Sequence, residues 1–542
     1  MSRANKYKDH GNLQLKQESD SKHGAKPKCT TISDIIKESD VKSWTPDKLI
    51  FISAGTGRGK SYFIKNRLNE LVQAAGGKIL MILHRCRCCD QFYHELEVAG
   101  KLDQITVTTY QAIEDKLHRN GEYDFSPYTH IVCDEFHYFL SDSDFSNLTG
   151  ASLSAILDQN DKVRIFLSAT GDAARDYIAS LSQLEQVEYV IEDEVNRIAH
   201  LRFFNSYKTI RDIGMRTIIR GKKAVFFVTS TQKALEIKRM FDRKASFNCS
   251  QYNAAYTRYI GKKTLETLID NGMLRTQILV TTMSLEAGMN ILDPDVDTIV
   301  VDSTDINTVI QCIGRRRFDR NRINDKIDVY VKSVANSSLE RRIENKRAML
   351  DASDYLAEHG TREFLKKYPD ARMRGYHQSR SATIPTVKSV DVPGYDAVMW
   401  APNEISIYKY KLTIAEYTEM LKEDYGWCKA LARKLGFYDE ELGIYTYEVV
   451  NEDESLEEYL EAHVGEIYPT IPDRAELINK IDLVRGCRQM KNIETLNGAL
   501  AECKSAYRIE KLYSKGHKNA WTIVRHSVSK SVDKNIDDDC DE

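Results

Sequence analysis

The sequence predicts an α/β protein with two tandem parallel-sheet domains, followed by a mainly helical accessory region. Two observations carry this prediction. Between residues 41 and 335, short β-branched or aliphatic runs alternate with polar, helix-length stretches in two successive series. Strands that are apolar throughout and separated by helix-length intervals are typical of parallel sheets covered on both faces. After residue 335 the alternation stops, and the chain reads mainly as charged or amphipathic helices.

The predicted strands set the domain boundaries. The first domain, residues 41–200, holds the apolar runs at 49–53, 79–83, 105–108, 130–133 and 163–167. The second, residues 201–335, holds the runs at 224–228, 278–280, 298–301 and 327–331. Residues 1–40 are polar and charge-mixed, which predicts a flexible N-terminal arm. Residues 336–542 form the accessory region, which ends in the acidic tail DDDCDE.

Composition excludes several classes of protein. The 542 residues are 42% hydrophobic and 29% charged, which is a globular balance. No apolar run approaches the roughly 18 residues of a spanning helix, and the start lacks a hydrophobic signal core. Eleven cysteines with one C-x-x-C pair, Cys86 and Cys89, favour reduced thiols over zinc or disulfides. We therefore expect a cytoplasmic protein with no membrane partner. Because the net charge of the chain is −3, any surface that binds nucleic acid must be a local cluster of positive charge.

The most informative segment is AGTGRGKS at residues 54–61, between the first predicted strand and a helix-like stretch at 62–73. Glycines let a loop turn several backbone N–H groups toward a phosphate, and the following helix presents its positive end to the same anion. Lys60 is then placed to reach the β- and γ-phosphates of a nucleotide, with the Ser61 hydroxyl on Mg²⁺. The residues predicted to bind the nucleotide here are Gly55, Thr56, Gly57, Arg58, Gly59, Lys60 and Ser61.

A pair of carboxylates follows the strand predicted at 130–133. Asp134 and Glu135 open the sequence DEFH, and adjacent acids at a strand end can point in different directions. Phosphoryl transfer needs one acid to hold the metal and a base to orient water. A lone DEFH is more typical of an exposed acidic turn, but its place downstream of Lys60 in the same α/β series favours the catalytic interpretation.

Together these segments resemble the motifs of superfamily 2 helicases of the DExH type, in the family's order. Residues 54–61 match the AxxGxGKS form of motif I, Ala54 included, and residues 134–137 match motif II. The other motifs lie at 84–91 (Ia), 109–111 (Ib), 168–170 (III, SAT), 280–282 with 286–290 (V) and 311–315 (VI). The wording around motifs II and V is closest to DEAD/DEAH-box helicases of bacterial phages and mobile elements.

The resemblance implies two RecA-like domains that bind ATP and Mg²⁺ in the cleft between them. It implies that Lys60 and Ser61 bind phosphate and metal, that Asp134 holds Mg²⁺, and that Glu135 activates water. By the same resemblance, the residues that couple the nucleotide state to the grip on nucleic acid are His137, Ser168 and Thr170. The residues that contact the strand backbone are Arg85, Thr109, Thr281 and Thr282. Gly288 lines the cleft, and Gln311 and Arg315 contact the γ-phosphate.

One position departs from the family pattern. Motif VI usually has a second arginine three residues after the first, where this chain has Phe318. Arg316 and Arg317 lie close by, and we favour Arg315 and Arg317 as the catalytic pair without deciding which is the finger. An arginine in that role stabilises charge on the transferred phosphoryl group and is worth about 10³-fold or more in rate.

The predicted function is therefore an ATP-dependent helicase that translocates on and unwinds DNA, with RNA as an open alternative. We expect its partner to be single-stranded DNA or a duplex with a single-stranded tail. Two other functions stay open: a duplex-tracking translocase that separates no strands, and an ATP-gated nucleic-acid-binding protein with crippled turnover. Between residues 314 and 380, 17 Lys/Arg against 10 Asp/Glu indicate either a nucleic-acid contact or a solvated helix and connector.

Overall fold

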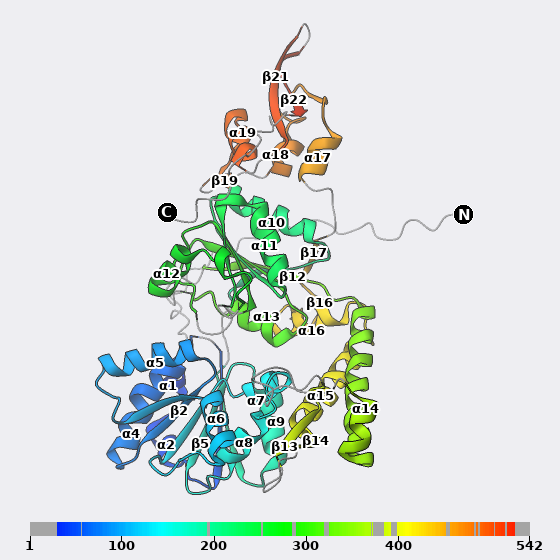
Figure 1. Cartoon of the computed structure of the whole chain (residues 1–542). Coiled ribbons are helices and arrows are strands. Elements are labelled where there is room, and N and C mark those ends of the chain that lie inside the picture. The colour runs from blue at the N-terminus through cyan, green and yellow to red at the C-terminus, as the bar shows by residue number, and fades with distance from the viewer. Residues whose placement is uncertain are drawn as a thin grey trace.

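The computed structural model describes residues 30–55, 57–191, 196–250, 253–283, 289–318, 325–369, 371, 384–391, 398–450, 456–481, 484–485, 488–502, 505–514 and 517–525. Within them the chain forms two α/β domains, each with one parallel sheet, and a C-terminal region of helices and short antiparallel strands (Figure 1). This confirms the predicted fold class, and every predicted strand lies inside an observed one. No helix in the described part of the chain is long and apolar enough to cross a membrane.

Domain 1 is a six-stranded parallel sheet in the order β3-β2-β4-β5-β1-β6. Its strands are β1 (Lys48–Ala54), β2 (Ile79–Leu83), β3 (Ile105–Thr109), β4 (His130–Asp134), β5 (Val163–Ser168) and β6 (Glu185–Ile191). Its main connecting helices are α5 (Cys86–Val98), α6 (Tyr110–Asn120), α7 (Tyr138–Ser141), α8 (Thr149–Leu157) and α9 (Asp172–Leu181). Strands β2 and β5 are buried along their whole length, which explains their continuous apolar sequence.

Domain 2 is a seven-stranded parallel sheet in the order β17-β7-β12-β11-β8-β10-β9. Its strands are β7 (Ile198–Phe204), β8 (Lys223–Val228), β9 (Ala245–Asn248), β10 (Ile278–Thr282), β11 (Val296–Asp302), β12 (Ile327–Lys332) and β17 (Glu448–Val450). Its helices are α10 (Tyr207–Ile219), α11 (Thr231–Met240), α12 (Lys262–Asn271) and α13 (Ile306–Ile313). The first sheet ends at Ile191 and the second begins at Ile198, so the sheets separate slightly before the predicted boundary.

The N-terminal segment that precedes β1 packs on domain 1. Helices α1 (Ile32–Ile35) and α2 (Glu38–Lys42) bury Ile32 and Val41 in the core. The Ile32 N–H donates to the carbonyl of Arg58 in the phosphate loop at 3.0 Å. The packed part of domain 1 therefore begins before residue 41, and residues 1–29 of the predicted arm lie outside the described residues.

The accessory region bridges the two domains. Its first elements are α14 (Asn336–Lys367), the hairpin β13 (Val387–Asp391) and β14 (Val398–Pro402), α15 (Glu404–Met420) and α16 (Gly426–Lys434), and α14 and α15 lie beside both domains in Figure 1. At one end of α15, Ile405 joins the core of domain 1, and Lys409 Nζ lies 2.8 Å from Asp144 Oδ2. In α16, Trp427 joins the core of domain 2. A change in the distance between the domains must therefore also move or bend this region.

Trp427→Ala is expected to destabilise the packing of the accessory region on domain 2. The side chain is fully buried, and its Nε1 donates to the carbonyl of Thr304 at 3.0 Å. Removing a buried tryptophan costs about 3–5 kcal/mol, so the free energy of unfolding measured in urea should fall by that order. Trp427→Phe keeps an apolar ring and should lose less. Equal stability of Trp427→Ala and the wild type would contradict this role.

Candidate nucleotide-binding site

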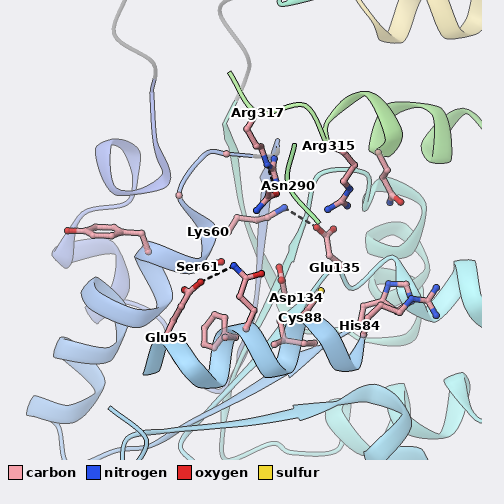
Figure 2. A pocket seen from close by; sticks show the side chains of 18 of the residues that line it. Lys60, Ser61, His84, Cys88, Glu95, Asp134, Glu135, Asn290, Arg315 and Arg317 are labelled. Carbon is pink, nitrogen blue, oxygen red and sulfur yellow. Dashed lines mark hydrogen bonds and ion pairs between the residues drawn. The ribbon is translucent and has the colours of Figure 1, made fainter. Parts of the chain in front are cut away.

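A cavity of about 400 Å³ lies between the two domains and is lined by residues of both (Figure 2). In domain 1, parallel strands end at one edge of the sheet, so the loops that follow them gather there. The loops of domain 1 contribute Gly57, Gly59, Lys60, Ser61, His84, Arg85, Asp134, Glu135 and His137, and domain 2 contributes Met283, Asn290, Gln311, Arg315 and Arg317. The cavity therefore brings predicted motifs of both domains together.

The phosphate loop follows β1 and has the backbone that its glycines allow. Gly57 and Gly59 have φ of +81° and +82°, in the left-handed region that other residues adopt rarely. A continuous helix from Lys60 to Ala74 begins at the loop and contains a π-helical turn, Phe63–Leu68. Lys60 Nζ lies 3.2 Å from the carbonyl oxygen of Ala54 and 3.4 Å from Glu135 Oε1. The loop thus presents a cation and a helix N-terminus to the cavity.

Two residues predicted to bind the nucleotide stand apart from the cavity lining. Arg58 is buried, and its Nη1 donates to the carbonyl of Thr30 at 3.1 Å. This contact fixes the loop to the N-terminal segment, so the side chain has a supporting role in this arrangement. Gly55 precedes the turn and is not among the lining residues that the structure describes. Thr56 and Gly288 lie outside the described residues.

Asp134 is the last residue of β4, Glu135 follows it, and both line the cavity. Glu135 has φ of +49°, an uncommon conformation for a residue other than glycine, and one often found at functional sites. Burial and the neighbouring Glu135 charge raise the pKa of Asp134. Burial also opposes ionisation of Glu135, but the cations of Lys60 and Arg315 outweigh it and lower the pKa of Glu135. The Asp134 Oδ1 atom is buried without a hydrogen-bond partner among the described residues.

The predicted coupling residues form one hydrogen-bonded chain that crosses between the domains. His137 Nδ1 lies 2.9 Å from Ser168 Oγ, which also accepts a bond from the Thr170 N–H at 3.0 Å. Gln311 Nε2, on α13 of domain 2, lies 2.9 Å from His137 Nε2 and 3.4 Å from Thr170 Oγ1. Burial lowers the pKa of His137 to about 4, so the ring is neutral at neutral pH and Nε2 can accept from the Gln311 amide.

Three consecutive arginines of motif VI have different surroundings. Arg316 is buried, and its Nη2 donates to both carboxylate oxygens of Asp325 at 3.0 Å. Arg315 and Arg317 instead line the cavity, and the Nε of Arg315 and the Nη1 of Arg317 are buried without hydrogen-bond partners among the described residues. Burial and the nearby charge of Arg315 lower the pKa of Arg317 to about 10. The structure thus separates one structural arginine from two that face the acids.

Asn290 is a site residue to which the sequence alone assigned no role. Its Oδ1 accepts a hydrogen bond from Arg317 Nε at 2.7 Å, and both side chains line the cavity. Its place two residues after Gly288 in motif V was the available signal. Phe318, the departure from the family pattern, lies under the guanidinium groups of Arg197 and Arg316, at 5.5 and 4.9 Å from the ring centre. Phe318 therefore packs against cations and does not replace one in the cavity.

The residues predicted to contact a nucleic-acid strand do not form one cluster. Arg85 borders the cavity with 47% of its side chain exposed, and its Nη2 lies 3.7 Å from Asp142 Oδ1. Thr109 caps α6 by accepting a bond from the Ala112 N–H at 3.0 Å. Thr281 is fully buried and accepts a bond from Asn248 Nδ2 at 3.1 Å, and the next residue, Thr282, is also buried. The strand contacts of these threonines stay predictions.

The residues of the cavity fit a magnesium nucleotide. Its volume is within the range of roughly 300–1,000 Å³ typical of ligand sites. The unpartnered Asp134 oxygen can accept a cation, and the unpartnered arginine nitrogens can donate to phosphate oxygens. The described residues hold no cluster of three or more His, Cys, Asp or Glu side chains that could bind a metal alone. Mg²⁺ in phosphate sites is usually bound by one or two carboxylates plus the substrate, so this donor set suits it.

Arg316→Ala is expected to lower stability, because it leaves the Asp325 carboxylate without its two charged hydrogen bonds. Breaking a buried ion pair by removing one partner costs about 3–5 kcal/mol. Thermal and urea unfolding should show a larger loss for Arg316→Ala than for the neighbouring variant Arg315→Ala, which removes no paired arginine. A reversed order of the two stabilities would overturn the assignment of Arg316 as the structural arginine.

Comparison with known proteins gives similarity to solved structures only. No protein-family model and no curated protein matches the chain. The DEAD-box helicase Mss116 bound to ssRNA and UDP-BeF is 14% identical, with 76% of this chain and 90% of that chain covered and a TM-score of 0.42. S. cerevisiae Dbp5 bound to RNA and ADP BeF3 is 16% identical, with 53% and 78% covered and a TM-score of 0.38. The Mycobacterium smegmatis helicase Lhr bound to ssDNA and AMP-PNP is 12% identical, with 54% and 40% covered and a TM-score of 0.33.

Proposed function

We propose that the chain is an ATP-driven nucleic-acid motor of the superfamily 2 DExH type, which hydrolyses ATP between its two α/β domains and thereby moves along and separates strands of DNA. One observation carries the proposal: Lys60 and Glu135 of domain 1 share a cavity with Arg315 and Arg317 of domain 2. Such a site is complete only while the domains are together. The state of the nucleotide would therefore control the distance between them.

The chain's own residues divide the chemistry among them. The phosphate loop and Lys60 would bind the β- and γ-phosphates, and Ser61 and Asp134 would hold Mg²⁺. Mg²⁺, when bound, neutralises charge on the phosphate oxygens. Glu135, which its lowered pKa keeps ionised at neutral pH, would orient the attacking water and accept its proton.

Movement of the domains would be coupled to this chemistry through the hydrogen bonds of Gln311. Its amide contacts His137 and Thr170 in the other domain, so separation of the domains must break both contacts. Alternating closure and opening would change the grip on a strand that crosses both domains. The preference for DNA comes from the resemblance to helicases of phages and mobile elements. Arg85, whose side chain is partly exposed at the border of the cavity, would contact the strand.

Glu135→Gln is expected to keep ATP binding and to lower turnover by at least about 10²-fold, because a positioned general base typically raises the rate by about 10²- to 10⁴-fold. Phosphate release by the purified chain, alone and with single-stranded DNA, single-stranded RNA or duplex, measures this. Glu95→Gln is the matched control, since Glu95 lines the same cavity but contacts Lys65 on the neighbouring helix.

The outcomes of this experiment separate the candidate functions. Stimulation by one single strand, lost in Glu135→Gln and kept in Glu95→Gln, supports the motor and identifies its track. Stimulation by duplex alone favours a translocase that separates no strands. Hydrolysis under no condition favours an ATP-gated binding protein, and unchanged hydrolysis in Glu135→Gln would refute the role of Glu135.

Arg315→Ala and Arg317→Ala, compared at saturating ATP, are expected to show which side chain is the finger. The finger variant should lose about 10³-fold or more in kcat, and the other should lose less. Asn290→Ala adds an independent test, because Asn290 holds Arg317 and does not contact Arg315 in any described hydrogen bond. A loss in kcat for Asn290→Ala should therefore accompany a loss for Arg317→Ala. Unchanged rates in both arginine variants would mean that neither residue is the finger.

A further inference from the structure

The last part of the accessory region, residues 456–525, is here called the C-terminal module. Its main elements in chain order are α17 (Leu456–Ala462), β18 (Ile467–Tyr468), α18 (Ala475–Ile481), α19 (Ile493–Glu502), β21 (Tyr507–Ser514) and β22 (His517–Arg525). The strands form an antiparallel sheet in the order β18-β22-β21, so the last strand is central. A short hairpin of β19 (Val484–Arg485) and β20 (Arg488–Gln489) separates α18 from α19.

This order of elements is that of a winged helix. A first helix and a short strand are followed by two helices and then by a two-stranded ribbon whose second strand pairs with the first short one. The helices α18 and α19 take the places of a helix-turn-helix, and β21 with β22 forms the wing. The wing is the longest hairpin in the described part of the chain and projects from the molecule in Figure 1. Topology alone does not establish binding, which depends on the residues that the fold presents.

One side chain fixes α19 to the wing. The Asn497 amide donates to the carbonyl of Ile509 at 2.7 Å, and its Oδ1 accepts from the Ile509 N–H at 2.7 Å. Asn497 thus satisfies both backbone groups of one strand residue, as a neighbouring strand would. Leu496, Ile509 and Ile523 are buried beside it in one apolar cluster. The base of the wing is therefore held rigidly against the helices.

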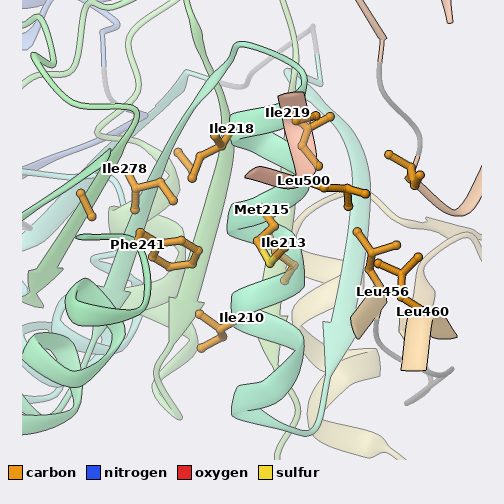
Figure 3. Packing of buried hydrophobic residues seen from close by; sticks show 14 of the residues in the cluster. Ile210, Ile213, Met215, Ile218, Ile219, Phe241, Ile278, Leu456, Leu460 and Leu500 are labelled. Carbon is orange, nitrogen blue, oxygen red and sulfur yellow. The ribbon is translucent and has the colours of Figure 1, made fainter. Parts of the chain in front are cut away.

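The module also shares its core with domain 2. Helix α10 contributes one side of a continuous apolar cluster, and the module contributes the other (Figure 3). Members from α10 include Ile213, Met215, Ile218 and Ile219, and members from the module include Leu456, Leu460, Leu496 and Leu500. Because this cluster is one core and not two surfaces in light contact, the wing must move with domain 2.

Four cations of the module lie on the wing strands, others lie on the β19–β20 hairpin, and none lies on α19, the helix that usually reads DNA. Helix α19 carries no lysine or arginine, and its ends carry Glu494 and Glu502. The two wing strands carry Arg508, Lys511, Lys518 and Arg525 against one carboxylate of their own, Glu510, which pairs with Arg508, and Lys511 Nζ lies 3.3 Å from Glu494 Oε1 of α19. A helix without cations is unsuited to lie between two rows of phosphates, whereas a two-stranded ribbon fits the major groove of B-form DNA.

We propose that the wing of the C-terminal module binds the phosphate backbone of double-stranded DNA, without reading its sequence. The wing would grip the duplex beside the single strand that the two α/β domains are proposed to hold. Since the wing belongs to the same rigid body as domain 2, each closure of the cleft would move the gripped duplex relative to domain 1. The inference goes beyond the proposed function, because duplex binding requires no hydrolysis of ATP.

The test removes two wing cations from the full chain, as Lys511→Gln with Lys518→Gln. Binding of a labelled duplex with a single-stranded tail, and of the single strand alone, is followed by fluorescence anisotropy without nucleotide at several salt concentrations. Each lost phosphate contact lowers the slope of log K against log salt by about 1, so the variant should lose about 2 in slope and roughly 10-fold or more in affinity for the tailed duplex. Its affinity for the single strand should not change.

The matched control is Lys42→Gln with Lys422→Gln. Like Lys511, these lysines are exposed and paired with a glutamate, Glu38 and Glu419 respectively, and they lie outside the module. The control should bind both probes as the wild type does, and Lys511→Arg with Lys518→Arg should keep duplex binding. Unchanged duplex affinity in the glutamine variant, or equal losses for duplex and single strand, would overturn the proposal. ATP hydrolysis by the same variant, which should stay normal with single-stranded DNA, separates failure of the wing from failure of the motor.

Discussion

The structure depends on two adjacent carboxylates, Asp134 and Glu135, that lie together in one partly enclosed cavity where β4 ends. Two neighbouring carboxylates repel each other when both are ionised, and cations from elsewhere in the cavity reduce this repulsion. Lys60 supplies one positive charge from within domain 1, and Arg315 supplies another from domain 2. The closed arrangement of the domains is therefore partly an electrostatic requirement of motif II. A phosphate would draw the arginines toward itself, and a cation at Asp134 would relieve the repulsion between the acids, so a bound nucleotide would act directly on the charges that the two domains bring together.

The accessory region limits how the domains can respond. Helix α15 is anchored on domain 1 immediately after motif II, where Ser406 Oγ donates to the carbonyl of Ser143 at 3.2 Å and Lys409 pairs with Asp144. Two residues earlier, Asp142 Oδ2 lies 2.8 Å from His84 Nε2 in motif Ia. The segment between the acids and α15 thus connects the cavity, motif Ia and the bridge to domain 2. A displacement of one domain would therefore reach this segment through α15 as well as through the cavity.

The sequence was sufficient to predict the central strands of both sheets and the phosphate loop, because these features depend on residues close together in the chain. The central strands and the phosphate loop are local features: fully buried strands need continuous apolar runs, and the loop needs its glycines. Strand β6 could not be predicted, since it is an edge strand whose alternating residues include exposed Glu185 and Glu188. The different roles of Arg315, Arg316 and Arg317 depend on Asp325 and Asn290, which the sequence does not show to be neighbours. The winged helix was hidden for the same reason: its helix α17 has seven residues and its strand β18 has two, and their pairing is long-range.

The short strand β17 has a consequence for the solubility of the chain. Residues Glu448–Val450 cover the outer edge of β7, where Glu448 Oε2 lies 2.5 Å from Arg202 Nε. An uncovered edge exposes unpaired N–H and C=O groups that can recruit a strand from another molecule. Beyond it, the C-terminal module shields the apolar side of α10. A chain shortened before residue 448 would expose both the edge of β7 and the apolar face of α10, and self-association would then compete with folding.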